Sequence, residues 1–113
     1  MRRLFLYCFL FSFLHPDIVY RVPIEGTIDL GLPPFIERIL KEAAVQNAKA
    51  VIFDINTFGG RVDAATQIKD AILGSDLLTV AFINRRAISA GALISLACKN
   101  IYMTGGGNIG AAT

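Results

Sequence analysis

The sequence predicts an α/β domain with a largely parallel sheet. Two short, nearly continuous apolar runs, at 50–55 and 77–83, are typical of strands covered on both faces. Two longer segments, at 33–46 and 62–73, place apolar residues at the spacing of one helix face. Strands that alternate with helices favour parallel pairing, because each helix carries the chain back to the start of the next strand.

The first half of the domain contains two expected strands and one expected helix. Residues 18–24 predict a strand, and Pro23 indicates a sheet edge or a strand end because proline cannot donate to a ladder. A turn-rich loop follows at 26–31. The helix at 33–46 begins with two prolines, which suit a first helical turn. Its apolar face comprises Ile36, Ile39, Leu40 and Ala43.

The second half continues the alternation. The helix at 62–73 should bury one face, and Gly74 lies just past its end. That face comprises Val62, Ala65, Ile68 and Ile72. Residues 89–97 are apolar nearly all round and predict a core helix. A fourth strand starts at 101–103, and a glycine-rich loop follows at 105–110.

Length and composition limit the classes of protein that fit. The 113 residues are 54% hydrophobic and 18% charged, which indicates one ordered domain. The net charge is +2, but Arg2 and Arg3 lie in the first 14 residues. Without those residues the domain has nine basic and nine acidic side chains. A neutral domain lacks the basic surface that nucleic acid requires, so we expect no nucleic-acid partner.

Residues 1–17 predict a signal or targeting segment, which leaves 18–113 as the folded domain. Two arginines precede the apolar run 4–14, as in the n- and h-regions of a secretory signal. The run is too short for a comfortable membrane span of about 20 residues. The alternative is a buried helix that Pro16 would end. Cleavage would remove Cys8 and leave Cys98 as a small core residue, with neither a disulfide nor a metal site.

The loop at 56–61 is the first candidate functional segment. Ligands of an α/β sheet bind at the carboxyl ends of its strands, and this loop follows such an end. Gly59 and Gly60 allow close approach of the backbone and can turn their N–H groups toward an anion or a developing oxyanion. The alternative is a tight turn that needs glycine only for its dihedral angles.

The segment 84–91 supplies a candidate nucleophile. Ser89 has Ala87 two residues before it and Gly91 two residues after it, a relaxed form of the G-x-S-x-G turn that exposes a nucleophilic serine. The alternative is that Ser89 only caps the following helix, since serine is a favoured N-cap. Arg85 and Arg86 precede it and are interpreted as solvated loop charges, with binding of an acidic group as the alternative.

No residue of the sequence is a good base for Ser89. His15 is the only histidine and lies in the targeting segment, which excludes a Ser-His-Asp triad. Lysine is the known substitute, but Lys41, Lys49 and Lys69 lie on or near exposed helix faces. Lys99 is separated from Ser89 by a helix about 13 Å long. The base is therefore expected from sequence outside these 113 residues, unless the site is inactive.

The segment 105–110 matches G-x-G-x-x-G, but it follows the fourth strand instead of the first. A dinucleotide fingerprint belongs between the first strand and first helix, with an acidic residue about 20 positions later. We therefore expect a glycine-rich loop and no cofactor.

Taken together, four segments resemble the NfeD-type membrane-bound serine proteases of the ClpP/crotonase superfamily. They are P-I-E-G-T-I-D-L-G-L at 23–32, N-T-F-G-G at 56–60, A-I-S-A-G-A-L-I-S at 87–95 and N-I-G-A-A at 108–112. The resemblance covers residues 19–113. It implies a spiral of β-β-α units, here incomplete at the C-terminus. One departure is Phe58, which stands where the superfamily commonly has proline before the glycine pair.

The resemblance also implies a function and a site. Ser89 would be the nucleophile of a Ser-Lys dyad, with the lysine missing from this sequence, and Gly60 and Ala90 would supply oxyanion-hole N–H groups. Gly59, Ala87 and Gly91 would support the loops. The enzyme would be an exported homo-oligomer at the extracytoplasmic face of a bacterial membrane, cutting apolar segments of membrane-associated proteins, with a stomatin-like partner. The fragment alone should be inactive. The alternatives are a crotonase-fold acyl-CoA enzyme and a non-catalytic scaffold.

Overall fold

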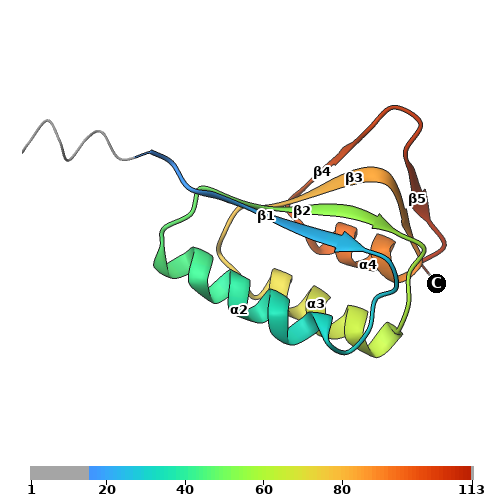
Figure 1. The fold of residues 1–113 in the computed structure, drawn as a ribbon, viewed down its shortest axis with the longest axis horizontal. Helices are drawn as coiled ribbons and strands as arrows, with labels where there is room; N and C mark the ends of the chain where they lie inside the picture. The colour runs from blue at the N-terminus through green and yellow to red at the C-terminus, as the bar shows by residue number, and fades with distance from the viewer. Residues whose placement is uncertain (1–15, 113) are drawn as a thin grey trace, which may run out of the picture.

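The computed structural model describes residues 16–112, which form one parallel sheet with helices against it (Figure 1). The expectations for Arg2, Arg3, Cys8 and His15 lie outside the described residues. The strands are β1 (Val19–Glu25), β2 (Ala50–Thr57), β3 (Thr79–Ile88), β4 (Asn100–Met103) and β5 (Asn108–Gly110). The helices are α2 (Leu32–Val45), α3 (Val62–Leu73) and α4 (Ala90–Ala97).

The sheet has the order β1-β2-β3-β4, and β5 pairs with the last part of β3. Every strand pairing among the described residues is parallel, which confirms the predicted sheet type. β1 lies at an edge, as Pro23 predicted. The carboxyl ends of β1, β2 and β3 therefore meet at one end of the molecule, where the candidate loops begin (Figure 1).

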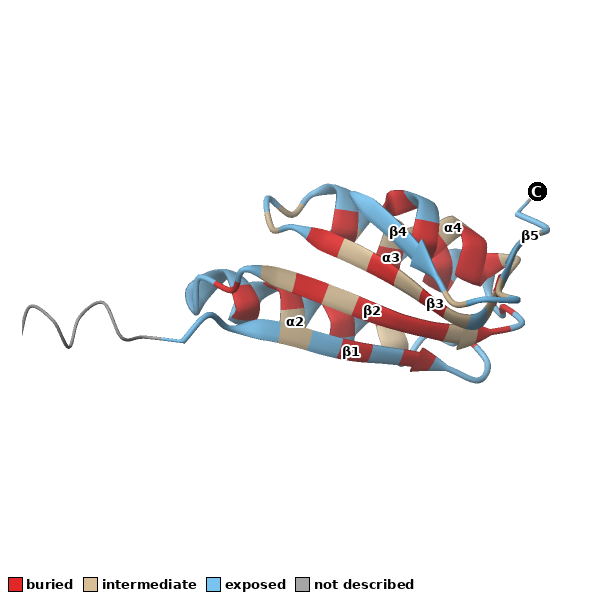
Figure 2. Cartoon of the chain, turned by 90° about the horizontal axis from the view of Figure 1, so that it is seen from above, coloured by how far each residue is buried: buried red, intermediate tan, exposed pale blue. Residues whose placement is uncertain are grey.

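The three helices lie on the same side of the sheet, and the core lies between them and the strands (Figures 1 and 2). Strand residues that face the helices are buried, including Val22 and Ile24 of β1 and Phe53 of β2. The helices contribute Ile36, Ala43, Ile68 and Ile94 to the same cluster. One face of α2 and one face of α3 are thus buried, as the helical periodicity predicted.

The expectation that β2 and β3 are covered on both faces is wrong. No helix of the part that the structure describes covers the opposite face, where Ile52, Val80 and Phe82 are only half-buried. The strand register pairs Ile52 with Val80 and Asp54 with Phe82. Apolar neighbours on this face therefore shield one another in part, which accounts for a continuous apolar sequence without a second helical layer.

The helix predictions are close to the structure, with two corrections. α3 spans the predicted residues, but Val62 is 69% exposed because it begins the helix at the open end of the sheet. Gly74 ends α3 with a φ of −79°, so it does not use the left-handed conformation that glycine favours there. No helix within residues 16–112 is long and apolar enough to span a membrane.

Two predicted loops contain strand. β3 continues to Ile88, five residues beyond its predicted end, through the polar segment Asn84–Arg86. Within the described residues Asn84 and Arg85 have no ladder partner, but the strand continues because pairing resumes at Arg86 with Asn108 and at Ala87 with Thr57. All of β5 lies in the expected glycine-rich loop at 105–110, and its residues Asn108–Gly110 pair with Arg86–Ile88 of β3. β4 is a strand as predicted, and all four of its residues are exposed.

Candidate active site

Ser89 lies at the sharp turn between β3 and α4. Its backbone has φ +55° and ψ −116°, a strained conformation for a residue with a Cβ atom. An N-cap serine instead has extended backbone and accepts a hydrogen bond from the first helical turn. Ser89 occupies the N-cap position but makes no side-chain cap hydrogen bond. The interpretation of Ser89 as only a helix cap is therefore wrong, and its hydroxyl is not engaged by α4.

The backbone of Ser89 is fixed on both sides. Its N–H donates to the carbonyl oxygen of Gly110 in β5 at 2.8 Å. Its own carbonyl oxygen accepts from the N–H groups of Ala92 at 2.9 Å and Leu93 at 3.2 Å. These bonds hold the strained turn in place, because β5 and the first turn of α4 are both tied to it. The side chain is left half-buried at the end of the sheet.

Gly59 packs directly against Ser89. A Cβ atom at Gly59 would lie 2.9 Å from the Cβ of Ser89 and 3.0 Å from the carbonyl oxygen of Ile88. Gly59 also has a φ of +111°, which L-residues rarely adopt. Glycine is thus required here both by the backbone angle and by the space that Ser89 occupies. The structure brings the two predicted loops into contact.

The glycine loop is held by backbone contacts from the loop after β1. The N–H of Ile28 donates to the carbonyl oxygen of Gly59 at 3.0 Å, and the N–H of Arg61 donates to that of Ile28 at 2.9 Å. The Thr57 hydroxyl donates to the Gly26 carbonyl oxygen at 2.5 Å and accepts from the Gly59 N–H at 3.0 Å. A Cβ atom at Gly60 would collide with the backbone of Ile28. Both glycines are therefore needed for close backbone approach.

Two backbone donors near Ser89 have no acceptor. Within residues 16–112, neither the Gly60 N–H nor the Ala90 N–H makes a hydrogen bond. The Ala90 nitrogen lies 3.3 Å from the Cβ position of Gly59, so Ala90 packs against the residue that precedes Gly60. Unpartnered backbone donors beside a serine hydroxyl are suited to a developing negative charge.

Ala87 and Gly91 flank the turn and are both buried. A Cβ atom at Gly91 would lie 2.5 Å from the Cγ2 of Thr57 and 3.7 Å from the Cβ of Ala87. The first turn of α4 can thus pack on Thr57 only because position 91 is glycine. Thr57 thereby contacts both the glycine loop and the helix that follows Ser89.

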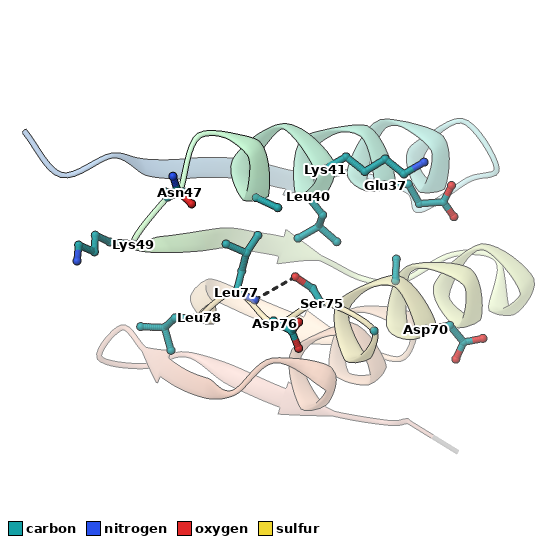
Figure 3. A pocket seen from close by; sticks show the side chains of 14 residues that line it. Glu37, Leu40, Lys41, Asn47, Lys49, Asp70, Ser75, Asp76, Leu77 and Leu78 are labelled. Carbon is teal, nitrogen blue, oxygen red and sulfur yellow. Dashed lines mark hydrogen bonds between the residues drawn. The ribbon is translucent and has the colours of Figure 1, made fainter.

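The four lysines all lie toward the other end of the sheet. Lys41 and Lys49 line a groove of about 970 Å³ between α2, α3 and the loops that precede β2 and β3 (Figure 3). Lys69 pairs with Asp70 at 3.3 Å, and Lys99 donates to the carbonyl oxygen of Asp76 at 3.1 Å. Asp70 and Asp76 line the same groove. No described lysine contacts Ser89, in agreement with the sequence argument.

The prediction that Arg85 and Arg86 are both solvated loop charges is wrong for Arg86. It is half-buried: its Nη1 atom donates to the Oδ1 of Asn56 at 3.2 Å, and its Cζ atom lies 4.5 Å from the centre of the Phe58 ring. Arg85 is exposed, as expected. Sequence reasoning missed this contact because the partners are 28 and 30 residues away. The one signal in the sequence was a phenylalanine directly before the glycine pair.

Arg61 and Asp63 form an ion pair just beyond Gly60. Two guanidinium nitrogens of Arg61 lie 3.0 and 2.8 Å from the two carboxylate oxygens. The hydrogen bond from Arg61 lowers the pKa of Asp63, and the carboxylate also accepts the Ala64 N–H at 2.9 Å. An anionic side chain at this place stabilises the start of α3.

The chain is similar to known proteins along nearly its whole described length. A family model described as the NfeD1b N-terminal domain matches residues 18–113. The membrane protein NfeD1b of Bacillus subtilis is 44% identical over 94 residues, which are 83% of this chain and 22% of that protein. The membrane-bound protease PH1510 of Pyrococcus horikoshii is 33% identical over 119 residues, covering 98% of this chain and 27% of that protein.

Two solved structures show the same fold. The 1510-N membrane-bound stomatin-specific protease, as a lysine-to-alanine mutant in complex with a substrate peptide, has a TM-score of 0.80 at 34% identity. That match covers 87% of this chain and 46% of the other. ClpP1 from Listeria monocytogenes has a TM-score of 0.65 at 27% identity, covering 69% of this chain and 46% of that chain. This chain spans about half of each solved structure and about a quarter of the curated relatives. It has a ClpP-like α/β fold and belongs to the NfeD1b N-terminal domain family.

Proposed function

We propose that this domain carries the nucleophile and the oxyanion hole of a serine endopeptidase. The observation that carries the proposal is Ser89: a serine on a strained strand-to-helix turn, with no capping bond and two unpartnered N–H groups beside it. A turn of this kind presents a hydroxyl at the end of the sheet, where α/β folds bind ligands.

In this reaction the Ser89 Oγ attacks the scissile carbonyl carbon while a base takes the hydroxyl proton. The carbonyl oxygen becomes an oxyanion, which the N–H groups of Gly60 and Ala90 would bind. Collapse of the tetrahedral intermediate breaks the carbon–nitrogen bond, and the proton held by the base passes to the leaving amine. Water then hydrolyses the acyl-enzyme by the reverse sequence of proton transfers.

We propose that the base is a lysine outside these 113 residues. The described lysines lie toward the other end of the sheet, and the chain spans about half of its solved relatives. Structures of the 1510-N protease include a serine-to-alanine mutant and a lysine-to-alanine mutant, the latter with a substrate peptide. The choice of these two residue types for mutation supports a Ser-Lys pair in that protease. We accordingly expect the 113-residue chain alone to be inactive.

The proposed substrate is an apolar segment of a membrane-associated protein. Phe58 and Val62 flank the glycine loop and are 74% and 69% exposed, so apolar side chains border the candidate site. The relatives' names, a membrane protein and a stomatin-specific protease, support a membrane location and a stomatin-like partner. With residues 1–17 as a signal, the domain would lie at the extracytoplasmic face, as part of a homo-oligomer.

Replacement of Ser89 in the full-length protein tests the proposal. We expect Ser89→Ala to abolish hydrolysis of an apolar peptide and labelling by a fluorophosphonate probe, because both need the Oγ nucleophile. Ser75→Ala is the matched control, since the Ser75 hydroxyl accepts only the N–H of Leu77 in the turn before β3. Hydrolysis that persists in Ser89→Ala would overturn the peptidase assignment. A full-length protein with no activity and no labelling would instead support a scaffold.

The isolated chain gives a second test of the base. Incubation of residues 1–113 with the same peptide should give no turnover above the level of Ser89→Ala, since no base reaches the hydroxyl. Addition of a lysine-bearing remainder of the protein in trans should restore activity. Ser89-dependent turnover by the isolated chain would show that the base lies within these residues.

A further inference from the structure

The ladder between β2 and β3 is interrupted just before the candidate site. Ile55 pairs with Ile83, but Thr57 pairs with Ala87, so β3 has two more residues than β2 over this interval. Arg85 lies in the interruption with a φ of +87°. A bulge bends the strand and leaves residues without ladder partners. Gly59 lies two residues after Thr57, and Ser89 lies two residues after Ala87, so both loops of the site begin just past this pair.

The side chain of Arg86 reconnects the two strands across this interruption. Its guanidinium donates to the side chain of Asn56, a β2 residue that has no partner in β3. It also stacks on the ring of Phe58. A cation over an aromatic face at this distance is attracted by the ring quadrupole. Phe58 directly precedes Gly59, and Arg86 lies three residues before Ser89. The contact therefore joins the segments that carry the two candidate oxyanion donors.

Phe58 needs a restraint that its own backbone does not supply. A proline at this position would fix φ near −65°, whereas phenylalanine leaves φ free to vary. The next peptide units carry Gly59 and Gly60, the most permissive residues of the chain. A rotation at Phe58 would therefore strain the Gly59–Gly60 peptide unit, whose carbonyl oxygen accepts the Ile28 N–H at 3.0 Å, and displace the Gly60 N–H relative to the Ala90 N–H. Three contacts restrain this segment: the Ile28 N–H holds the Gly59 carbonyl oxygen, the Thr57 hydroxyl holds the Gly59 N–H, and the Arg86 guanidinium holds the Phe58 ring.

We propose that Arg86 is a positioning residue, which clamps Phe58 and thereby sets the Gly60 N–H for oxyanion binding. The expected effect on kcat rests on the proposed function, whereas the expected effect on the position of the Gly60 N–H does not. Arg86 acts on the reaction only through the Phe58–Gly59–Gly60 segment. Asn56 and Phe58 both contact its guanidinium, whereas the neighbouring Arg85 is exposed.

The kinetic test uses the full-length protein with the variants Arg86→Gln, Phe58→Leu and their double mutant. Loss of one cation–π contact should lower kcat by about 2- to 30-fold, with KM nearly unchanged because the oxyanion forms only in the transition state. If Arg86 acts through Phe58, Arg86→Gln should cost less than about twofold in the Phe58→Leu background. Arg85→Gln is the matched control and should leave kcat unchanged. Additive losses, or equal losses in both arginine variants, would overturn the proposal.

An activity-independent test separates this inference from the proposed function. Amide resonances of Gly59, Gly60 and Ala90 are followed by NMR in the 113-residue chain, with hydrogen exchange at each amide. Arg86→Gln should shift the Gly60 resonance and speed its exchange, while Arg85→Gln should leave both unchanged. An unchanged Gly60 amide would refute the clamp even if Ser89 proves catalytic. A shifted Gly60 amide in a protein without Ser89-dependent hydrolysis would confirm the clamp and refute the peptidase.

Discussion

Replacement of Gly59 by alanine tests whether the contact between the glycine loop and Ser89 is as close as the structure has it. The added methyl would lie 2.9 Å from the Ser89 Cβ, 3.0 Å from the Ile88 carbonyl oxygen and 3.3 Å from the Ala90 nitrogen. Two of these three atoms belong to the backbone of a turn that β5 and α4 hold. The neighbours therefore have little freedom to move away.

The expected cost has two parts. A non-glycine residue in a sparsely populated positive-φ conformation costs about 1–3 kcal/mol. Forcing a methyl group into a packed site costs about 1–3 kcal/mol more. We therefore expect Gly59→Ala to lower the free energy of unfolding by about 2–6 kcal/mol, a large share of the 5–15 kcal/mol typical of a domain.

Two other glycines separate these parts. Gly26 has a φ of +71° but nothing within 4 Å of its Cβ position, so Gly26→Ala carries only the backbone cost of about 1–2 kcal/mol. Gly105 has neither a positive φ nor a near neighbour, so Gly105→Ala should change stability by less than about 0.5 kcal/mol. Urea unfolding followed by far-ultraviolet circular dichroism measures all three, since the chain has no tryptophan.

A difference of less than about 0.5 kcal/mol between Gly59→Ala and Gly26→Ala would refute the close-contact argument, because the steric part alone exceeds that value. Stability that is lost while fluorophosphonate labelling of the full-length protein survives would show that the loop tolerates displacement without disturbing Ser89.

Two further predictions concern the packing around the site and in α4. Gly91→Ala should lower the free energy of unfolding by about 1–3 kcal/mol. Adding Thr57→Ser should recover most of this loss in a double-mutant cycle, because it removes the Cγ2 atom that the new methyl meets and keeps the hydroxyl. No recovery in urea unfolding would contradict this geometry. Burial raises the pKa of the Cys98 thiol to about 12, so in a Cys8→Ser background the folded chain should resist a thiol reagent at pH 8 and react after unfolding. Because the unfolded thiol titrates near 8.5, stability should be full below that pH and fall as pH rises toward 12, a fall that Cys98→Ala should reduce.

The fold could be predicted because its signals are local. The bounds of α3 match the predicted helix, since a 3.6-residue period and a following glycine identify it within one segment. The end of β3 could not be predicted, because Asn84–Arg86 is polar and the strand continues past it only through pairing of Arg86–Ile88 with distant residues. β5 could not be predicted for the same reason: it lies in a glycine-rich segment and is a strand only through its pairing with β3.

The site was predictable in part, for a topological reason. Carboxyl ends of neighbouring parallel strands share one edge, so Gly59 and Ser89 had to come close even though 30 residues separate them. The residues that hold them were not predictable. Ile28 and Gly110 act through backbone N–H and carbonyl groups, which any residue type carries. The Arg86 contact with Phe58 likewise depends on a strand interruption that no local pattern indicates.

A site assembled from backbone groups explains why small residues dominate it. The turn is held by the carbonyl oxygen of Gly110, the glycine loop is held by the backbone of Ile28, and the two unpartnered donors are backbone N–H groups. Side chains at 59 or 60 would collide with backbone of these segments, and a side chain at 91 would collide with the Cγ2 of Thr57, which accounts for glycine at each position. In the proposed reaction Ser89 would bring the reactive side chain, and the backbone N–H groups would bring the electrostatic stabilisation. The proposed reaction also needs a proton acceptor, which backbone groups cannot supply, so it requires a basic side chain that reaches this end of the sheet.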